Sequence, residues 1–399
     1  MQECQCGCKE VFRAFKIAFD VKKIFLGFAG FAASLIWTVV IIALLRSMEL
    51  ITIGPEVILS NVFRSPHIGA PQLWKVFLST IKSLNLGNGV SIVLLVLGLL
   101  IIWSFVGGAI TRLSAVEYAR NESIKLSESV KFASNKFWSY FWAPLAPAVG
   151  VMVFMFCNIL GGLIGQIKFV GELFIGLGFP LVIISSFLII FIALVGLLGL
   201  GLMFPTISAE GSDAFDAMSR AYSYTITKPK SLLCYCFTAI VSGGALVLFI
   251  ALVACCVFQT SFDTINIGMG QKFDAIRGVV KNLPTTQDAG AAAQTSTGLA
   301  ALSTQTLKIT AVLIMFYIGL TNLIIGGIAS SFLFSAKTII YFLMRKEVDG
   351  TEITDVYMEE KKEESTLGGS TKAPETGEKP GENPGHTEEK SEETEGEHS

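Results

Sequence analysis

Six long apolar stretches, separated by polar segments, dominate the chain. A helix needs about 20 predominantly apolar residues to cross the hydrocarbon core of a bilayer, and each stretch is that long. We therefore predict an all-α polytopic membrane protein with six transmembrane helices. The predicted spans are about 24–45, 90–110, 143–165, 173–204, 232–258 and 307–344.

Shorter amphipathic patterns precede alternate spans. In three segments apolar residues recur every three or four positions, which is the period of a helix with one apolar stripe. We expect three membrane hairpins, each preceded by an amphipathic cytoplasmic helix, with Ser127 and Ser212 as N-caps of the second and third helices. The stripes are Phe12, Phe15 and Phe19; Val130, Ala133, Phe137 and Phe141; and Phe215, Met218, Tyr222 and Ile226. Two further amphipathic pieces are expected in the loops, at 73–84 and 273–283.

The 399 residues are 52% hydrophobic, and their net charge of −2 hides an asymmetry. Residues 351–399 hold 15 acidic and 5 basic side chains, so the remainder of the chain is basic. Near the predicted spans, 15 Lys and Arg lie in one set of segments and 7 in the alternate set. Basic residues favour the cytoplasmic side, so both termini are predicted inside, in the cell (inner) membrane. The predicted divisions are a cytoplasmic segment 1–23, a membrane domain 24–346 and a disordered acidic tail 347–399.

The cysteines predict no structural disulfides, because none lies in the long polar loops. Cys4, Cys6 and Cys8 precede the first span and resemble half of a metal site. A tetrahedral site needs a fourth ligand, and no histidine is near in sequence. An unpatterned reduced terminus is the favoured interpretation, and we expect no cofactor.

Charged and capping residues gather in the segments between spans two and three and between spans four and five. Asp213 lies where the helix dipole favours an anion, and Asp216 and Arg220 are spaced as an i,i+4 ion pair. We predict that these residues form a partner-contact or structural surface. The alternative, a catalytic or metal-binding pair of carboxylates, is weaker because no histidine or nucleophile accompanies them. The set is Arg112, Glu117, Arg120, Glu210, Ser212, Asp213, Asp216 and Arg220.

Inside the predicted spans the deep amides are Asn158 and Asn322. Hydrogen bonding to each other, or from each to backbone, is the simplest prediction. Small residues let helices approach closely in lipid, so helix contacts are predicted at Ser104 with Gly108, Gly161 with Gly165, Gly196 with Gly199, Gly243-Gly244 and Gly326-Gly327.

The segments 210–224, 107–117 and 339–352 together resemble a group of bacterial multi-pass membrane proteins of unknown activity. The resemblance would cover roughly residues 9–357. It implies a membrane protein and no activity, ligand or catalytic residue. The cysteine-rich start and the acidic tail lie outside it.

No phosphate-binding loop, dinucleotide fingerprint, nucleophile elbow or metalloprotease motif occurs in the sequence. The centres of the predicted spans carry no ionisable residue, which counts against transport driven by protons or cations. We predict a non-enzymatic scaffold or assembly component of the cell envelope, in contact with the bilayer and with other membrane or cytoplasmic proteins but not with nucleic acid. The alternatives are a channel or permease for a neutral or lipid-like solute, and a membrane domain that partners a separate enzyme.

Overall fold

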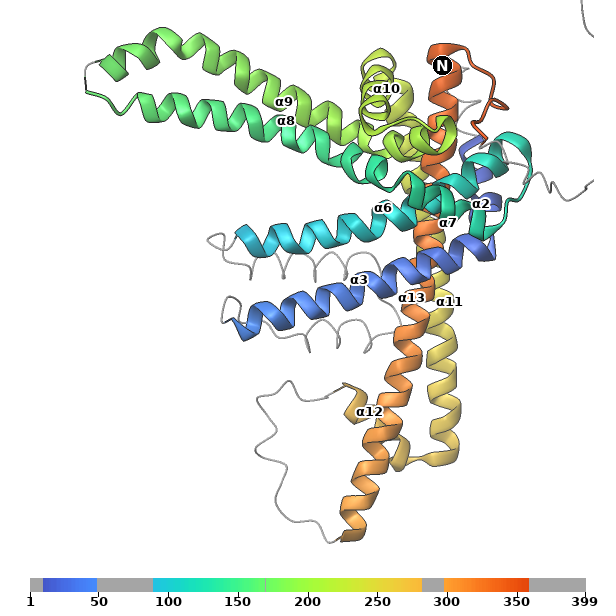
Figure 1. Ribbon diagram of the computed structural model, residues 1–399. Helices are drawn as coiled ribbons and strands as arrows, with labels where there is room; N and C mark the ends of the chain where they lie inside the picture. Colours follow the sequence, from blue (N-terminus) through green and yellow to red (C-terminus); the bar gives the residue numbers. More distant parts are fainter. Residues whose placement is uncertain (1–9, 49–88, 169, 282–297, 359–399) are drawn as a thin grey trace, which may run out of the picture. The chain divides into compact units, whose positions relative to one another are not determined.

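The computed structural model of the chain describes residues 10–48, 89–168, 170–281 and 298–358, and the regular structure in these ranges is helical (Figure 1). Six of the helices are long and apolar enough to cross a membrane. They are α3 (Val21–Ser47), α6 (Gly89–Arg120), α8 (Phe137–Ile164), α9 (Val170–Glu210), α11 (Pro229–Met269) and α13 (Gly298–Asp349). The predicted all-helical class and the six candidate spans are thus confirmed.

These helices extend past the predicted span ends, because an apolar run marks only the part that matches the hydrocarbon thickness. The backbone ladder continues until a cap or a turn stops it. Asp20 starts α3 by accepting a hydrogen bond from the Lys22 backbone at 3.0 Å, and Pro229 occupies the first turn of α11, where its missing N–H costs nothing. Helix α9 continues through Pro180.

Four shorter helices lie between the long ones: α2 (Arg13–Ala18), α7 (Leu126–Asn135), α10 (Ala214–Thr227) and α12 (Gln271–Lys281). The prediction that Ser127 caps α7 was wrong. The backbone N–H groups of Glu128 and Ser129 donate to Lys125 O, so the first turn already begins at Lys125 and Ser127 lies inside it. The helix predicted at 273–283 corresponds to α12, whereas the piece predicted at 73–84 lies outside the described residues.

The apolar stripes expected in α2, α7 and α10 are buried only in part. Ala133 is fully buried, and Phe15, Val130, Met218 and Tyr222 pack partly buried against the core. Phe12 and Phe19 are each more than half exposed, and Phe215 is 72% exposed. The fully buried face of each helix includes Ala or Ser residues, which let the helix approach its neighbours closely. The buried residues are Ala14, Ile17 and Ala18 in α2; Ser129, Phe132 and Ala133 in α7; and Ala217, Ala221, Tyr224 and Thr225 in α10.

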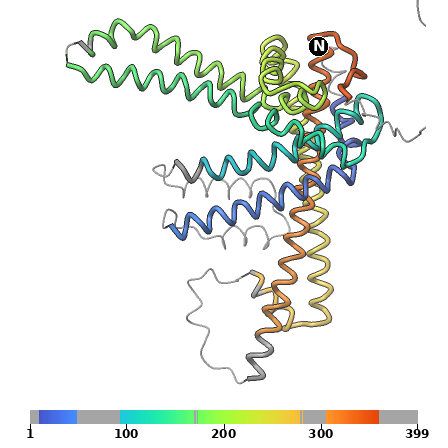
Figure 2. Tube along the Cα trace, viewed as in Figure 1, coloured from blue at the N-terminus to red at the C-terminus, as the bar shows by residue number. Residues whose placement is uncertain are grey.

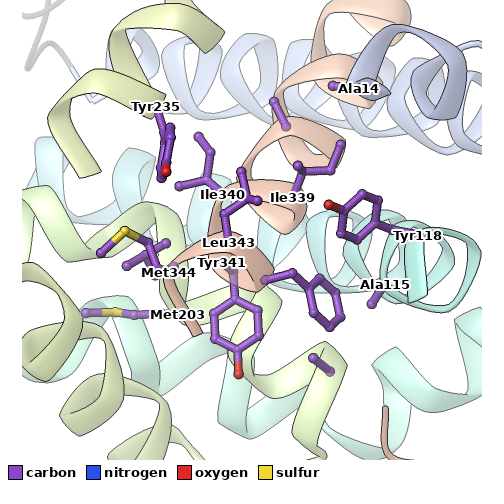
Figure 3. Packing of buried hydrophobic residues seen from close by; sticks show 14 of the residues in the cluster. Ala14, Ala115, Tyr118, Met203, Tyr235, Ile339, Ile340, Tyr341, Leu343 and Met344 are labelled. Carbon is purple, nitrogen blue, oxygen red and sulfur yellow. The ribbon is translucent and has the colours of Figure 1, made fainter. Parts of the chain in front are cut away.

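The main apolar core surrounds the last turns of α13. Figure 3 shows Ile339, Ile340 and Leu343 of α13 among side chains from other helices, with Tyr118 of α6 and Tyr235 of α11 nearby. Helix α13 contacts α2, α3, α6, α9, α10, α11 and α12. Figure 2 traces the chain through these helices, and α8 packs mainly on α9. The end of α13 therefore packs against the last turns of α6 and α9 and the first turns of α11.

The contact between α3 and α13 depends on glycine. A Cβ atom on Gly27 would lie 2.6 Å from the Gly327 carbonyl oxygen, and one on Gly327 would lie 2.8 Å from Ile24 O. The prediction of a close helix contact at Gly326-Gly327 is thus confirmed. The contacts predicted at Gly161 with Gly165 and at Gly243-Gly244 form at one glycine of each pair. A Cβ on Gly165 would lie 2.6 Å from Ile175, and one on Gly243 would lie 2.6 Å from Phe332, whereas the described chain places no atom within 4 Å of an added Cβ on Gly161 or Gly244.

Candidate functional site

The densest group of charged side chains centres on Glu210, the last residue of α9. Its Oε2 lies 2.9 Å from Arg220 Nε, and its Oε1 accepts a hydrogen bond of 2.5 Å from the Tyr341 hydroxyl. The same Oε1 lies 3.2 Å from Arg345 Nε. The Glu210 side chain is only 9% exposed. One carboxylate thus links α9, α10 and α13, and we call Glu210, Arg220, Tyr341 and Arg345 the polar cluster.

The predicted pair of Asp216 and Arg220 is present, with a distance of 3.3 Å from Asp216 Oδ1 to Arg220 Nε. It is more exposed than the Glu210 contact, because the Asp216 side chain is 46% exposed. Burial, the largest single effect, lowers the pKa of Arg220, but Glu210, Tyr224 and Asp216 together raise it by more, so the net shift is upward. Arg220 therefore stays charged and has two carboxylate partners.

Asp213, not Ser212, caps α10. Asp213 Oδ1 accepts a hydrogen bond from the Asp216 backbone N–H at 2.9 Å. The chain reverses at Gly211, whose φ of +65° suits glycine, and this turn moves the helix start one residue past the predicted position. The Ser212 hydroxyl is buried and has no hydrogen-bond partner among the described residues.

Arg112 of α6 is nearly buried and donates to two backbone carbonyls. The distances are 2.6 Å to Ser208 O and 2.8 Å to Tyr357 O. Its guanidinium also lies 4.2 Å from the centre of the Phe132 ring, a cation–π contact. Arg112 thus joins α6, α7, α9 and the segment that follows α13.

That segment, residues 351–357, packs on the end of the molecule where the polar cluster lies; we call it the C-terminal segment. The Tyr357 backbone N–H donates to Ala209 O at 2.8 Å, and Arg345 donates to Asp355 O at 2.7 Å and to Asp355 Oδ2 at 3.1 Å. Arg120 lies 3.5 Å from Val356 O. The predicted tail boundary at 347 is therefore too early, because α13 continues to Asp349 and the chain packs as far as Tyr357. The rest of the predicted disordered tail lies outside the described residues.

A second ion pair, between Lys23 and Glu117, joins α3 to α6. Lys23 Nζ lies 2.5 Å from Glu117 Oε2 and donates to Ile17 O at 2.8 Å. The Lys23 side chain is fully buried. Sequence reasoning selected Glu117 but missed Lys23, although opposite charges at the adjoining ends of the first two spans were an available signal.

Tyrosine hydroxyls complete this region, and sequence reasoning did not select them. Tyr224 donates to Asp349, and Tyr235 donates to Glu347. Burial raises the pKa of Tyr224, and its hydrogen bond to Asp349 adds to that shift. Tyr140 hydrogen-bonds to Ser208 Oγ over 2.8 Å. These partners lie far apart in the sequence, so no local pattern indicated them.

The two amides predicted inside the spans do not pair with each other. Asn158 Oδ1 on α8 accepts a hydrogen bond of 2.6 Å from Ser185 Oγ on α9, because α8 packs along α9, whereas Asn322 lies on α13. Cys4, Cys6 and Cys8 lie outside the described residues. Within the described ranges, no group of three or more His, Cys, Asp or Glu could hold a metal ion, and the described cysteines are free thiols.

The residues selected from the sequence therefore act mainly within the chain. Arg112, Arg120, Glu210, Asp216 and Arg220 hold backbone carbonyls or opposite charges, and Asp213 caps a helix. A carboxylate that two arginines and a phenol already hold is a poor general base, because the charged form is stabilised and its lone pairs are occupied. The polar cluster therefore has a structural role: its ion pairs and hydrogen bonds hold the ends of α9, α10 and α13 together.

The sequence matches no protein-family model, and comparison with curated proteins and with solved structures finds no match. The proposed function therefore rests on the fold and on the contacts within this chain.

Proposed function

We propose that the protein is a non-enzymatic scaffold in the cell membrane and that it binds the helices of other membrane proteins through α8 and α9. The observation that carries this proposal is the unused packing surface of these two helices. Only 6% of the apolar window of α8 and 11% of that of α9 is buried within the chain, against 44% for α6. Helix α11 is also only 11% buried, but it carries two glycines with open space beside them, against four on α8 and α9 together. A hydrophobic surface of this extent must face lipid or another protein.

The glycines of this surface favour protein partners. Gly161 and Gly162 on α8, and Gly176 and Gly178 on α9, have no atom of the described chain within 4 Å of an added Cβ. In lipid, helices associate by close packing over small residues. Gly107 and Gly327 are covered in this way by the chain itself. The open glycines of α8 and α9 are the equivalent surface left for a second protein.

The contacts of the polar cluster also support a scaffold over an enzyme. Glu210 and Arg345 are engaged within the chain, and their side chains are at most 10% exposed. The partner-contact role predicted for Glu210 and Arg112 therefore moves to the membrane surface of α8 and α9. The polar cluster would keep that surface in a fixed position.

The packing between spans two, four and six bears on the alternative of a channel or permease. The rings of Phe204 and Phe334 stack with their centres 6.1 Å apart, and Gly107 lies directly against Phe334. Ser114 and Ser335 hydrogen-bond to each other at 2.9 Å. Side chains therefore fill the space that a solute path between these helices would need, which favours the scaffold.

Photo-crosslinking in native membranes tests the scaffold. A photoreactive residue at Phe156 on α8, which is 59% exposed, should give protein adducts. One at Ile36 on α3, which is 64% exposed on a helix whose Gly27 and Gly30 are already covered by α13 and α6, should give mainly lipid adducts. Gly161→Leu should remove the adducts at Phe156 by blocking close approach. Lipid adducts alone at Phe156 would refute the proposal. Identification of the captured protein would separate an envelope scaffold from a membrane domain that partners a separate enzyme.

We further propose that the six helices form three membrane hairpins in the inner membrane, with the termini, α2, α7 and α10 on the cytoplasmic side. The excess of Lys and Arg in those segments supports this orientation. An impermeant thiol reagent should label Lys131→Cys and Lys228→Cys from the same side, and Lys168→Cys from the other. Labelling of Lys131→Cys and Lys228→Cys from opposite sides would overturn the topology.

A further inference from the structure

Lys337 is a cation in an apolar setting. It lies on α13, one turn before Tyr341, and is half-buried. Its Nζ lies 5.2 Å from the centre of the Phe334 ring. Its aliphatic carbons lie 3.8 to 4.0 Å from where a Cβ of Gly201 would be, and the Cys236 thiol is its electrostatic neighbour. Among the described residues, no carboxylate and no hydrogen-bond acceptor pairs with it.

The other charged residues near this end of α13 do not supply the missing anion. Glu210 is held by Arg220, Tyr341 and Arg345, and Glu347 by Tyr235 and Lys228. A lysine at this depth is costly without an anion, because its charge loses water and gains only an aromatic face in return. Among the described residues, the charge of Lys337 is therefore left without an anion.

The surroundings of Lys337 are those of a lipid site. Gly201 and Cys236 belong to α9 and α11, which both pack on α13. One helical turn deeper in the predicted spans, a leucine is about half exposed or more on two of these helices: Leu333 on α13 and Leu197 on α9. Exposed leucines on the membrane side of Lys337 are suited to contact with acyl chains.

The depth of the amine also suits a headgroup. Gly201 lies three residues before the predicted end of span four, and Cys236 lies four residues after the predicted start of span five. At about 1.5 Å per residue, Lys337 is thus within roughly one helical turn of the predicted cytoplasmic ends of both spans. Lysine side chains at this depth reach the phosphate layer.

We propose that Lys337, packed beside Gly201, Cys236 and Phe334, binds the headgroup of an anionic phospholipid of the cytoplasmic leaflet. The ammonium contacts the phosphate, the absence of a side chain at Gly201 lets the lysine stem lie against α9, and the leucines contact the acyl chains. This site is independent of the scaffold surface on α8 and α9.

Native mass spectrometry of the full-length protein tests the site. The purified chain, released from nanodiscs of equal phosphatidylglycerol and phosphatidylcholine, should retain phosphatidylglycerol preferentially. Lys337→Gln should lower that retention about five-fold, the factor expected for one lysine near a membrane surface. Lys337→Arg should keep it. Lys308→Gln, at the opposite end of the same helix, is the matched control and should leave retention unchanged.

A second variant moves the lysine without removing its charge. Gly201→Leu would displace the Lys337 stem that lies against this glycine, so it should also lower retention of phosphatidylglycerol. Unchanged retention in both Lys337→Gln and Gly201→Leu would overturn the proposal. Equal retention of the two lipids by the wild-type chain, or displacement by inorganic phosphate, would overturn it too, because the first indicates an apolar surface without charge recognition and the second a soluble anion.

Discussion

Replacement of Glu210 by glutamine removes one charge from the polar cluster and changes almost nothing in shape. Glutamine still accepts a hydrogen bond from Tyr341, but it leaves Arg345, whose side chain is 10% exposed, without its carboxylate at 3.2 Å. Breaking a buried ion pair on one side costs about 3 to 5 kcal/mol. Because Glu210→Gln keeps the hydrogen bond from Tyr341, and Arg345 keeps its contact with Asp355, we expect a cost at the lower end of this range. The expected loss of unfolding free energy is about 3 kcal/mol, or roughly a 150-fold change in the folding equilibrium.

Asp216→Asn is the matched control, because Asp216 pairs with Arg220, which Glu210 also contacts, but its side chain is 46% exposed. Exposed i,i+4 pairs contribute only about 0.3 to 0.5 kcal/mol. The free energy of unfolding of both variants can be measured by titrating sodium dodecyl sulfate into the protein in mixed micelles and following tryptophan fluorescence.

We expect Glu210→Gln to lose much more unfolding free energy than Asp216→Asn. If the unfolding free energy of Glu210→Gln lies within about 0.5 kcal/mol of the wild-type value, solvent reaches the polar cluster and the cluster does not stabilise the fold. If Asp216→Asn costs as much as Glu210→Gln, exposure does not set the strength of these pairs. A further variant, Arg345→Gln combined with Glu210→Gln, should recover part of the loss, because it removes the uncompensated charge.

Two other changes test the packing. Gly327→Ala should destabilise the fold by about 1 to 3 kcal/mol, since its Cβ would meet the backbone of α3. Gly244→Ala on α11, where space is open, should be neutral or stabilising. Equal losses of unfolding free energy in the same detergent titration would contradict the α3–α13 contact. Removal of residues 350–399 deletes backbone carbonyls that accept hydrogen bonds from Arg112 and Arg345. It should therefore lower the thermal midpoint and speed proteolysis near Arg112, while removal of 359–399 should do neither. Identical behaviour of the two truncated proteins would exclude a structural role for the C-terminal segment.

The sequence predicted the six long helices because an apolar run of bilayer length has few alternative structures. It also predicted Asp216 with Arg220 and the glycine contact at Gly327, since both depend on local spacing or on residue size. It did not predict the partners of Glu210. Tyr341 lies 131 residues away, and periodicity within a segment contains no information on such a pairing.

The short helices show a second limit of periodicity. In α10 the pattern gave Phe215, Met218, Tyr222 and Ile226 as one apolar stripe. Met218 and Tyr222 pack against the core, but Phe215 and Ile226 are more than half exposed, and Ala217 and Ala221 are fully buried. Hydrophobicity alone does not rank the two faces of such a helix. The size of the side chains does, because the face that packs on another helix needs small residues.

The place of the C-terminal segment in the chain has a consequence for biosynthesis. Arg112 is synthesised 245 residues before Tyr357, its carbonyl partner, so α6 enters the membrane long before this contact can form. The arginines at the end of the bundle acquire their last acceptors only when translation has passed the final span. Closure of this polar end therefore waits for residue 357, and a chain that stops before it would lack carbonyl acceptors of Arg112 and Arg345, which quality-control proteases could recognise.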